Sequence, residues 1–70
     1  MSPPISHKQF RRMIRDNGHF SVANKKAGHY KIEDASGTFI SSYAVTHGKG
    51  TKGDEVLPIY VKRYLQAIEG

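Results

Sequence analysis

The chain has 70 residues, a formal net charge of +5 and a pI of about 9.8, and it contains no cysteine. This length fits a single domain over residues 1–70, too small to enclose a large cofactor, and the lack of cysteine excludes disulfides and thiolate-bound metals. The excess of Lys and Arg favours an anionic partner: nucleic acid, an acidic protein or a membrane surface. Because no apolar run is long enough to cross a membrane and no signal region follows Met1, we expect a cytoplasmic protein with no membrane-spanning segment.

The first predicted element is a helix that begins after Ser6 and ends at Asn17-Gly18. Ser6 and Gln9 have the spacing of a capping box, and Ile5 is placed to pack on the helix as a hydrophobic staple. Asn and Gly both tolerate the left-handed conformation that ends helices. The apolar residues of this helix recur at helical spacing, at Phe10, Met13 and Ile14. We interpret its basic residues as solvent-exposed: Lys8, Arg11, Arg12 and Arg15.

Three strands are expected next. Phe20–Ala23 and His29–Glu33 alternate along the chain, and Thr38–Thr46 is rich in β-branched and aromatic residues. The first connection, Asn24–Gly28, is a basic turn, and the second, Asp34–Gly37, has the composition of a hairpin. Because these connections are too short for crossovers, antiparallel pairing is predicted.

The alternation of the second strand also assigns its two faces. We expect Tyr30 and Ile32 to face the core, which leaves His29 and Lys31 on the other face of the sheet. After the third strand, His47–Gly53 forms a glycine-rich basic loop.

The C-terminal segment predicts a second helix. Pro58 suits its first turn, and Lys62 and Arg63 are expected to face outward. Its apolar face would carry Leu57, Val61, Tyr64, Leu65 and Ile68. The sequence therefore predicts an α+β fold in the order α-β-β-β-α. Two helices would cover one face of a three-stranded antiparallel sheet, and the other face would stay open.

Two common motifs can be rejected, and we expect no metal and no cofactor. The segment Gly48–Gly53 matches the glycine pattern of dinucleotide-binding loops, but no strand follows the last helix to complete the required parallel unit. The P-loop is excluded because Lys49 is followed by Gly rather than Ser or Thr. The histidines lack the spacing of metal ligands, and we expect His7 and His19 at the surface. No arrangement of Ser, His and Asp typical of a nucleophile stands out.

His29 is the strongest candidate for chemistry on RNA. The lysines before it, Lys25 and Lys26, offer phosphate contacts, and Gly28 lets the backbone turn tightly or approach a ligand. With RNA on the open face, His29 could take the proton of a 2′-hydroxyl, which would then attack the adjacent phosphate without a metal. Taken on its own, such a residue is more often an ordinary strand histidine than a catalytic one.

This reaction also needs a second proton donor and positive charge near the phosphate. His47 is the first candidate for the donor, and Tyr30 is the second, although we expect Tyr30 in the core. Charge that builds on the phosphate would be stabilised by Lys26, Lys31 or the basic loop, which carries Lys49 and Lys52.

Three short motifs resemble the HicA family of small toxins, which are mRNA interferases of toxin–antitoxin systems. The first is a glycine turn with a histidine at the start of the second strand, Ala27-Gly28-His29. The second ends the third strand, Ala44-Val45-Thr46-His47, and the third is the last-helix pattern Val61-Lys62-Arg63-Tyr64-Leu65. The resemblance runs from about Ser6 to Ile68, and the chain departs from the family in lacking the usual proline before His47.

The resemblance implies a fold like that of a double-stranded-RNA-binding domain and a metal-independent endoribonuclease that cleaves mRNA. His29 takes the place of the catalytic histidine. From the residues themselves, we expect the RNA backbone to be contacted by Lys25, Lys26, Gly28, Lys31, Lys49 and Lys52. The resemblance also implies a cognate antitoxin that covers the open sheet face and the histidine. Two other hypotheses stay open: a non-catalytic module that binds RNA by shape and phosphates, and a small regulator that docks on an acidic protein.

Overall fold

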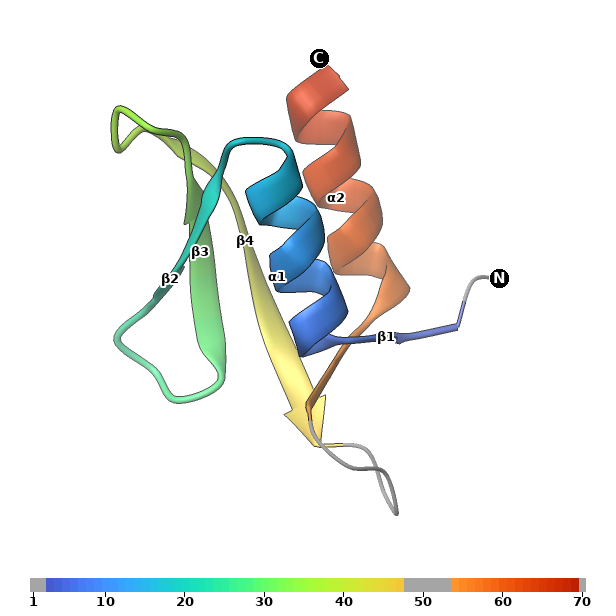
Figure 1. Cartoon of the computed structure of the whole chain (residues 1–70). Helices are drawn as coiled ribbons and strands as arrows, with labels where there is room; N and C mark the ends of the chain where they lie inside the picture. Colours follow the sequence, from blue (N-terminus) through green and yellow to red (C-terminus); the bar gives the residue numbers. More distant parts are fainter. Residues whose placement is uncertain (1–2, 48–53, 70) are drawn as a thin grey trace.

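In the computed structural model, which describes residues 3–47 and 54–69, the fold is a five-stranded antiparallel sheet with two helices (Figure 1). The elements are β1 (Ile5–Ser6), α1 (His7–Asp16), β2 (Phe20–Ala23), β3 (His29–Glu33), β4 (Phe39–His47), β5 (Asp54–Val56) and α2 (Pro58–Glu69). The strands lie in the order β1-β5-β4-β3-β2, so β1 and β2 form the two edges. The predicted α+β class, with an antiparallel sheet and two helices, is confirmed. The prediction of three strands is wrong.

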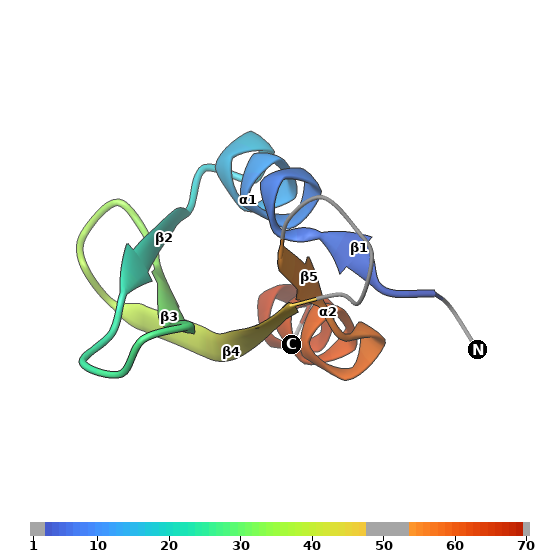
Figure 2. The same cartoon turned by 90° about the horizontal axis from the view of Figure 1, so that it is seen from below.

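Two short strands account for this difference. Ile5 of β1 pairs with Val56 of β5, Ser6 pairs with Glu55, and Val56 also pairs with Val45 near the end of β4. Strands of two and three residues are too short to reveal an alternation, and their pairing depends on partners far along the chain. Ile5 therefore belongs to the sheet as well as preceding the helix cap. Figure 2 shows the sheet curving from β2 to β1 around α1.

The first helix begins as predicted. The side-chain oxygen Oγ of Ser6 accepts a hydrogen bond from the Gln9 backbone N–H at 3.1 Å, which satisfies one of the free amides of the first turn. At the other end, Gly18 has a φ of +81° whereas Asn17 has a φ of −87°. The helix therefore ends at Asn17-Gly18 as predicted, and of these two residues the glycine adopts the left-handed conformation.

The central hairpin pairs β3 with β4 around a polar turn. Tyr30 lies opposite Tyr43. In the connection, Oδ1 of Asp34 accepts hydrogen bonds from the N–H groups of Ser36 at 2.9 Å and Thr38 at 3.0 Å. A carboxylate that holds two backbone amides fixes this turn, and the predicted hairpin is confirmed. The third predicted strand, β4, begins and ends one residue later than expected.

The core lies between the helices and one face of the sheet. Phe10 of α1 makes edge-on ring contacts with Tyr43 of β4 and Tyr64 of α2, at centroid distances of 4.8 and 5.7 Å. Because one side chain touches the sheet and the second helix, both helices pack on the face that carries Tyr43. The buried apolar side chains among the described residues are Phe10, Ile14, Ile32, Tyr43, Val56 and Tyr64.

The second helix buries less of its apolar stripe than the sequence predicts. Tyr64 is fully buried and Val61 is half-buried. In contrast, Leu57, which precedes α2, remains 38% exposed, and Leu65 and Ile68 remain 38 and 37% exposed, so the predicted core role is wrong for these three. A helix that packs through Tyr64 can bury only the part of a wide stripe that faces its neighbours. Neither described helix is long and apolar enough to cross a membrane.

Candidate nucleic-acid interface

The turn between β2 and β3 is held by backbone hydrogen bonds around a left-handed glycine. Gly28 has a φ of +80°, a conformation that other residues adopt at a cost. The His29 N–H donates to the carbonyl oxygen of Lys26 at 3.1 Å, and the Asn24 N–H donates to that of His29 at 2.9 Å. The Val45 N–H also donates to the Gly28 carbonyl oxygen at 2.9 Å, which ties the turn to β4. The predicted glycine turn is confirmed.

This turn presents His29 at the first position of β3. The side chain of His29 is exposed, and it lines a small hollow of about 140 Å³ together with Asn24, Lys25 and Lys26. The two lysines of the predicted site therefore lie beside the histidine.

Strand alternation places His29 on the open face of the sheet, as predicted. Ile32 is fully buried, and the ring of Tyr30 stacks on that of Tyr43 at a centroid distance of 5.3 Å. His29 and Lys31 have the opposite parity, so they lie on the face that the helices leave uncovered. Their partners in β4 are small, Ala44 and Ser42 respectively, which leaves room on the β4 side of both side chains. On its other side, Lys31 lies opposite Val22 of β2.

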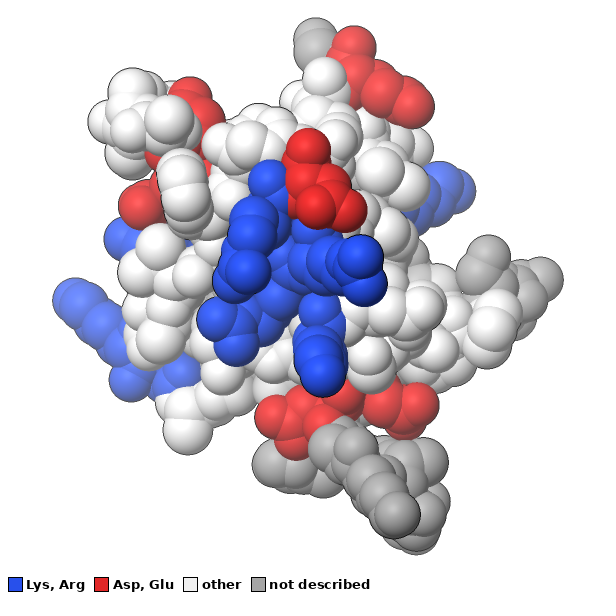
Figure 3. All heavy atoms as spheres, viewed as in Figure 1, with Lys and Arg blue, Asp and Glu red and all other residues white. Residues whose placement is uncertain are grey.

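Two groups of positively charged side chains in Figure 3 lie near the candidate site, apart from the blue atoms at the right of the view beside α2. One group of Lys and Arg side chains covers the outer face of α1. The other lies at the lower left, where Figure 1 has the β2–β3 turn with Lys25 and Lys26. The two groups are visible from the same side, so one extended polyanion could approach both.

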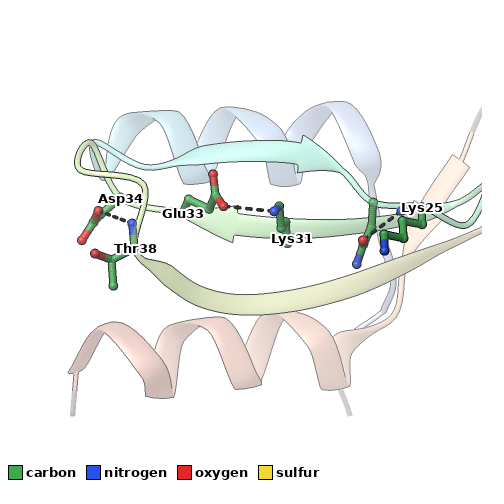
Figure 4. A network of polar contacts seen from close by, with 6 residues as sticks. Lys25, Lys31, Glu33, Asp34 and Thr38 are labelled. Atoms are coloured by element: carbon green, nitrogen blue, oxygen red, sulfur yellow. Dashed lines mark hydrogen bonds and ion pairs between the residues drawn. The ribbon is translucent and has the colours of Figure 1, made fainter.

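Lys31 is partly neutralised by its neighbour. Its Nζ atom lies 3.3 Å from Oε2 of Glu33, two positions along the same face of β3 (Figure 4). The pair is partly solvent-exposed, and such surface ion pairs contribute only about 0–1 kcal/mol, so a phosphate can compete for the lysine. Among the predicted RNA contacts, Lys25 and Lys26 are therefore better placed than Lys31.

The position of His7 differs from the one predicted from the sequence. It was expected at the surface, yet it is half-buried, with Nε2 hydrogen-bonded to the Tyr43 hydroxyl at 2.8 Å. The same hydroxyl is hydrogen-bonded to Oγ of Ser21. The imidazole also packs on the ring of Tyr30, with centroids 4.6 Å apart. A signal was present, because His7 lies three residues before Phe10 and so shares the buried face of α1.

Burial also sets the charge of this histidine. The pKa of His7 is lowered from its ordinary value of 6.5, first by desolvation and then by the positive charge of Arg11, while Asp54 acts in the opposite direction. The pKa of Tyr43 is raised, mainly because burial disfavours its charged form. Both groups are therefore neutral near pH 7, and their contact is a neutral hydrogen bond inside the fold.

His19 is held in a similar way, so the surface expectation is wrong for it too. Its Nδ1 atom lies 2.7 Å from the hydroxyl of Tyr64, which also accepts a hydrogen bond from Nδ2 of Asn17 at 3.3 Å. These hydrogen bonds connect Asn17 and His19, which follow α1, to Tyr64 of α2. Two of the histidines thus serve the fold through tyrosine hydroxyls.

The other predicted site residues are only partly covered by the structure. The backbone of His47 pairs with that of Asp54 at the end of β4, and the structure does not describe the side chain of His47. Lys49 and Lys52 lie outside the described residues, as does the glycine-rich segment that contains them. Within residues 3–47 and 54–69, no group of three or more His, Asp or Glu side chains could hold a metal ion.

Comparisons with protein-family models, curated proteins and solved structures found no match to this chain.

Proposed function

We propose that this chain is a metal-independent endoribonuclease that cleaves mRNA and acts as the toxin of a toxin–antitoxin pair. The observation that carries the proposal is the setting of His29. It is exposed at the start of β3, next to Lys25 and Lys26, on a sheet face where its cross-strand partner is the small residue Ala44. The resemblance of Ala27-Gly28-His29 to the histidine motif of HicA toxins supports the same conclusion.

In this proposal, the neutral imidazole of His29 takes the proton of a 2′-hydroxyl, whose oxygen attacks the adjacent phosphorus. The bond from phosphorus to the 5′-oxygen of the next nucleotide breaks, which gives a 2′,3′-cyclic phosphate and a 5′-hydroxyl. A general base of this kind contributes roughly 10²–10⁴-fold in rate. DNA is not cleaved because it lacks the attacking hydroxyl.

The leaving oxygen must receive a proton from a second group. Tyr30 is poorly placed for this role, because its ring packs against those of His7 and Tyr43 on the helix side of the sheet. His47 is therefore the proposed donor. Lys25 and Lys26 would stabilise the phosphate charge, with Lys31, Lys49 and Lys52 as further contacts, and Gly28 would let the strand approach the backbone closely.

The proposal extends to the fold family and to a partner. The order α1-β2-β3-β4-α2 would correspond to the core of a double-stranded-RNA-binding domain, with β1 and β5 as additions. The partner is a cognate antitoxin that covers the open sheet face. Two apolar residues on this sheet support such a cover, since Phe39 is 60% exposed and Val22 is 37% exposed. Both proteins would act in the cytoplasm, where mRNA is translated.

The direct test is cleavage of a 5′-labelled single-stranded RNA by the purified chain in EDTA. We expect fragments that end in 2′,3′-cyclic phosphate, and an all-deoxy strand of the same sequence should stay intact. The variant His29→Ala should lose at least 100-fold in rate, and free imidazole should restore part of it, because the position is open to solvent. Lys62→Ala, on the outer side of α2, is the matched control and should cleave normally. Wild-type rates in His29→Ala would overturn the proposal.

The same pair of variants can be compared in cells. Induced expression of the wild type should stop growth and fragment mRNA, whereas His29→Ala at equal protein level should do neither. If the wild type is harmless and total RNA stays intact, His29 has no catalytic role in the cell.

The second candidate is a module that binds RNA without cleaving it. One observation favours it: within the described part of the chain, no side chain is hydrogen-bonded to the imidazole of His29, so none orients it as a base. In this case, the wild type and His29→Ala would bind RNA equally and leave it intact.

A further inference from the structure

The outer face of α1 carries a continuous basic stripe. Its members are spaced at i, i+3, i+4 and i+7, so they share one side of the helix over two turns: Lys8, Arg11, Arg12 and Arg15. All four are exposed, while Phe10 and Ile14 occupy the buried side of the same helix. None of the four makes an ion pair with another described residue, since the ion pair within residues 3–47 and 54–69 is Lys31–Glu33. Figure 3 shows the stripe as the largest group of blue atoms in that view.

The stripe borders two hollows rather than a flat surface. The larger, of about 720 Å³, is lined by the four basic residues together with Ser6, His7, Asp16 and Asp54. The smaller, of about 210 Å³, lies where Arg11 and Arg15 meet β2, and Phe20 and Ser21 form part of its wall. Arg11 and Arg15 line both hollows, so they join the helix surface to the sheet edge.

An exposed aromatic side chain lies at the strand that borders the smaller hollow. Phe20 belongs to the edge strand β2 and is 54% exposed; its pairing with Glu33 places its side chain on the open face of the sheet, while the residue also borders the hollow of Arg11 and Arg15. A cationic groove beside an exposed aromatic ring is the combination by which proteins bind single-stranded nucleic acid, because phosphates meet the cations and a base stacks on the ring. An acidic protein would form ion pairs with the arginines, but its carboxylates would not stack on the ring of Phe20.

We propose that α1 is a second RNA-contact surface, on which Arg11, Arg12 and Arg15 bind phosphates of single-stranded RNA and Phe20 stacks on a base. The inference rests on the proposed function in that RNA is the ligand. It extends the RNA contacts from the β2–β3 turn, past the edge strand β2, to α1. The sequence pattern alone predicts only that the charges of this helix are exposed to solvent. The substrate class it assigns is unpaired RNA long enough to reach both basic groups of Figure 3.

The dimensions of the stripe set the size of the effect. Residues 8 and 15 are about 10 Å apart along the helix axis at a rise of 1.5 Å per residue. Since one strand carries a phosphate about every 3.4 Å along a nucleic-acid helix axis, the stripe can neutralise about three phosphates. Each phosphate contact of a single strand contributes about 0.7 to the slope of log affinity against log salt concentration, so the loss of two contacts lowers the slope by about 1.4.

The test measures binding of a fluorescent single-stranded RNA between about 50 and 200 mM salt. Every protein carries His29→Ala, so that the RNA is not consumed. We expect the double variant Arg11→Gln/Arg15→Gln to lower the slope by about 1.4 and to bind at least tenfold more weakly at the lower salt concentration. The double variant Lys62→Gln/Arg63→Gln removes the same charge from α2 and should bind like the parent. Phe20→Ala should weaken binding by about tenfold with an unchanged slope. Thermal denaturation checks that each variant is folded.

Two results would overturn the inference. The first is equal weakening by the two double variants, which would mean that only net charge matters. The second is displacement of the RNA by polyglutamate at equal charge concentration, together with no effect of Phe20→Ala, which would assign the surface to an acidic protein. Cleavage by the protein with an intact His29 is measured separately. Normal RNA binding without cleavage refutes the nuclease and leaves this surface standing, whereas normal cleavage with no effect of the arginine variants refutes the surface alone.

Discussion

The hydroxyl of Tyr43 offers the sharpest test of how the fold is held together. Its side chain is 2% exposed, and the hydroxyl is hydrogen-bonded to Nε2 of His7 and to Oγ of Ser21. The substitution Tyr43→Phe removes one oxygen and keeps the ring contacts with Phe10 and Tyr30. The change therefore isolates the hydrogen bonds that connect α1, β2 and β4.

The expected cost follows from those two bonds. Each contributes about 1 kcal/mol net, so we expect the free energy of unfolding to fall by about 2 kcal/mol. A chain of this length has a stability of roughly 4–10 kcal/mol, which makes the loss a large fraction of the total. Because 1 kcal/mol lowers the Tm of a domain this small by about 4–8 °C, the Tm should fall by about 8–16 °C.

The assay is thermal and urea denaturation followed by circular dichroism. Tyr60→Phe is the matched control, since its half-buried ring also packs against the core and its hydroxyl has no hydrogen bond to another described residue. Combining Tyr43→Phe with Ser21→Ala should cost less than the sum of the two single changes, because the same bond is lost in both. A Tm change as small as that of Tyr60→Phe would refute the reasoning. It would show that His7 and Ser21 can exchange their hydrogen bonds to Tyr43 for hydrogen bonds to water without loss of unfolding free energy.

Three further changes test local features. As the pH is lowered through 6.5, the urea midpoint of the wild type should fall. Burial and the charge of Arg11 lower the pKa of His7, so the unfolded chain binds a proton there that the folded chain does not bind. The variant His7→Gln should show a weaker dependence of the midpoint on pH. Gly28→Ala should cost about 1–2 kcal/mol in unfolding free energy from backbone strain alone, since a Cβ there would lie 3.8 Å from Val45 atoms, an ordinary contact. Ser6→Ala should cost about 1 kcal/mol through loss of the helix cap, and Ser6→Asp should largely restore the stability. Unchanged denaturation midpoints in any of the three would contradict the corresponding assignment.

The predictable parts of the fold are those set by local rules. The cap at Ser6, the alternation of Tyr30 and Ile32 and the glycine turn before His29 each depend on residues close in sequence. They are found as predicted, and so is the exposed position of His29. The antiparallel pairing followed from the short connections.

The parts that could not be predicted depend on contacts across the chain. β1 exists only because Ile5 meets Val56, fifty-one positions later, and no local pattern records that pairing. The hydroxyl of Tyr43 meets His7 in the same way, across thirty-six positions. Sequence spacing places His7 on the apolar side of α1, but it does not reveal that a tyrosine hydroxyl lies opposite.

The contrast among the histidines decides how activity data on this chain have to be interpreted. Of the histidines whose side chains are described, His7 and His19 are hydrogen-bonded to buried tyrosines, whereas His29 is exposed and faces away from the helices. Substitution of either bound histidine lowers the folded fraction, so it lowers any activity without a role in chemistry. Substitution of His29 leaves the described hydrogen bonds of the turn intact, because they involve only its backbone. A loss of cleavage at unchanged Tm is therefore informative for His29 alone, and for His7 and His19 the rate has to be divided by the folded fraction before any catalytic role is assigned.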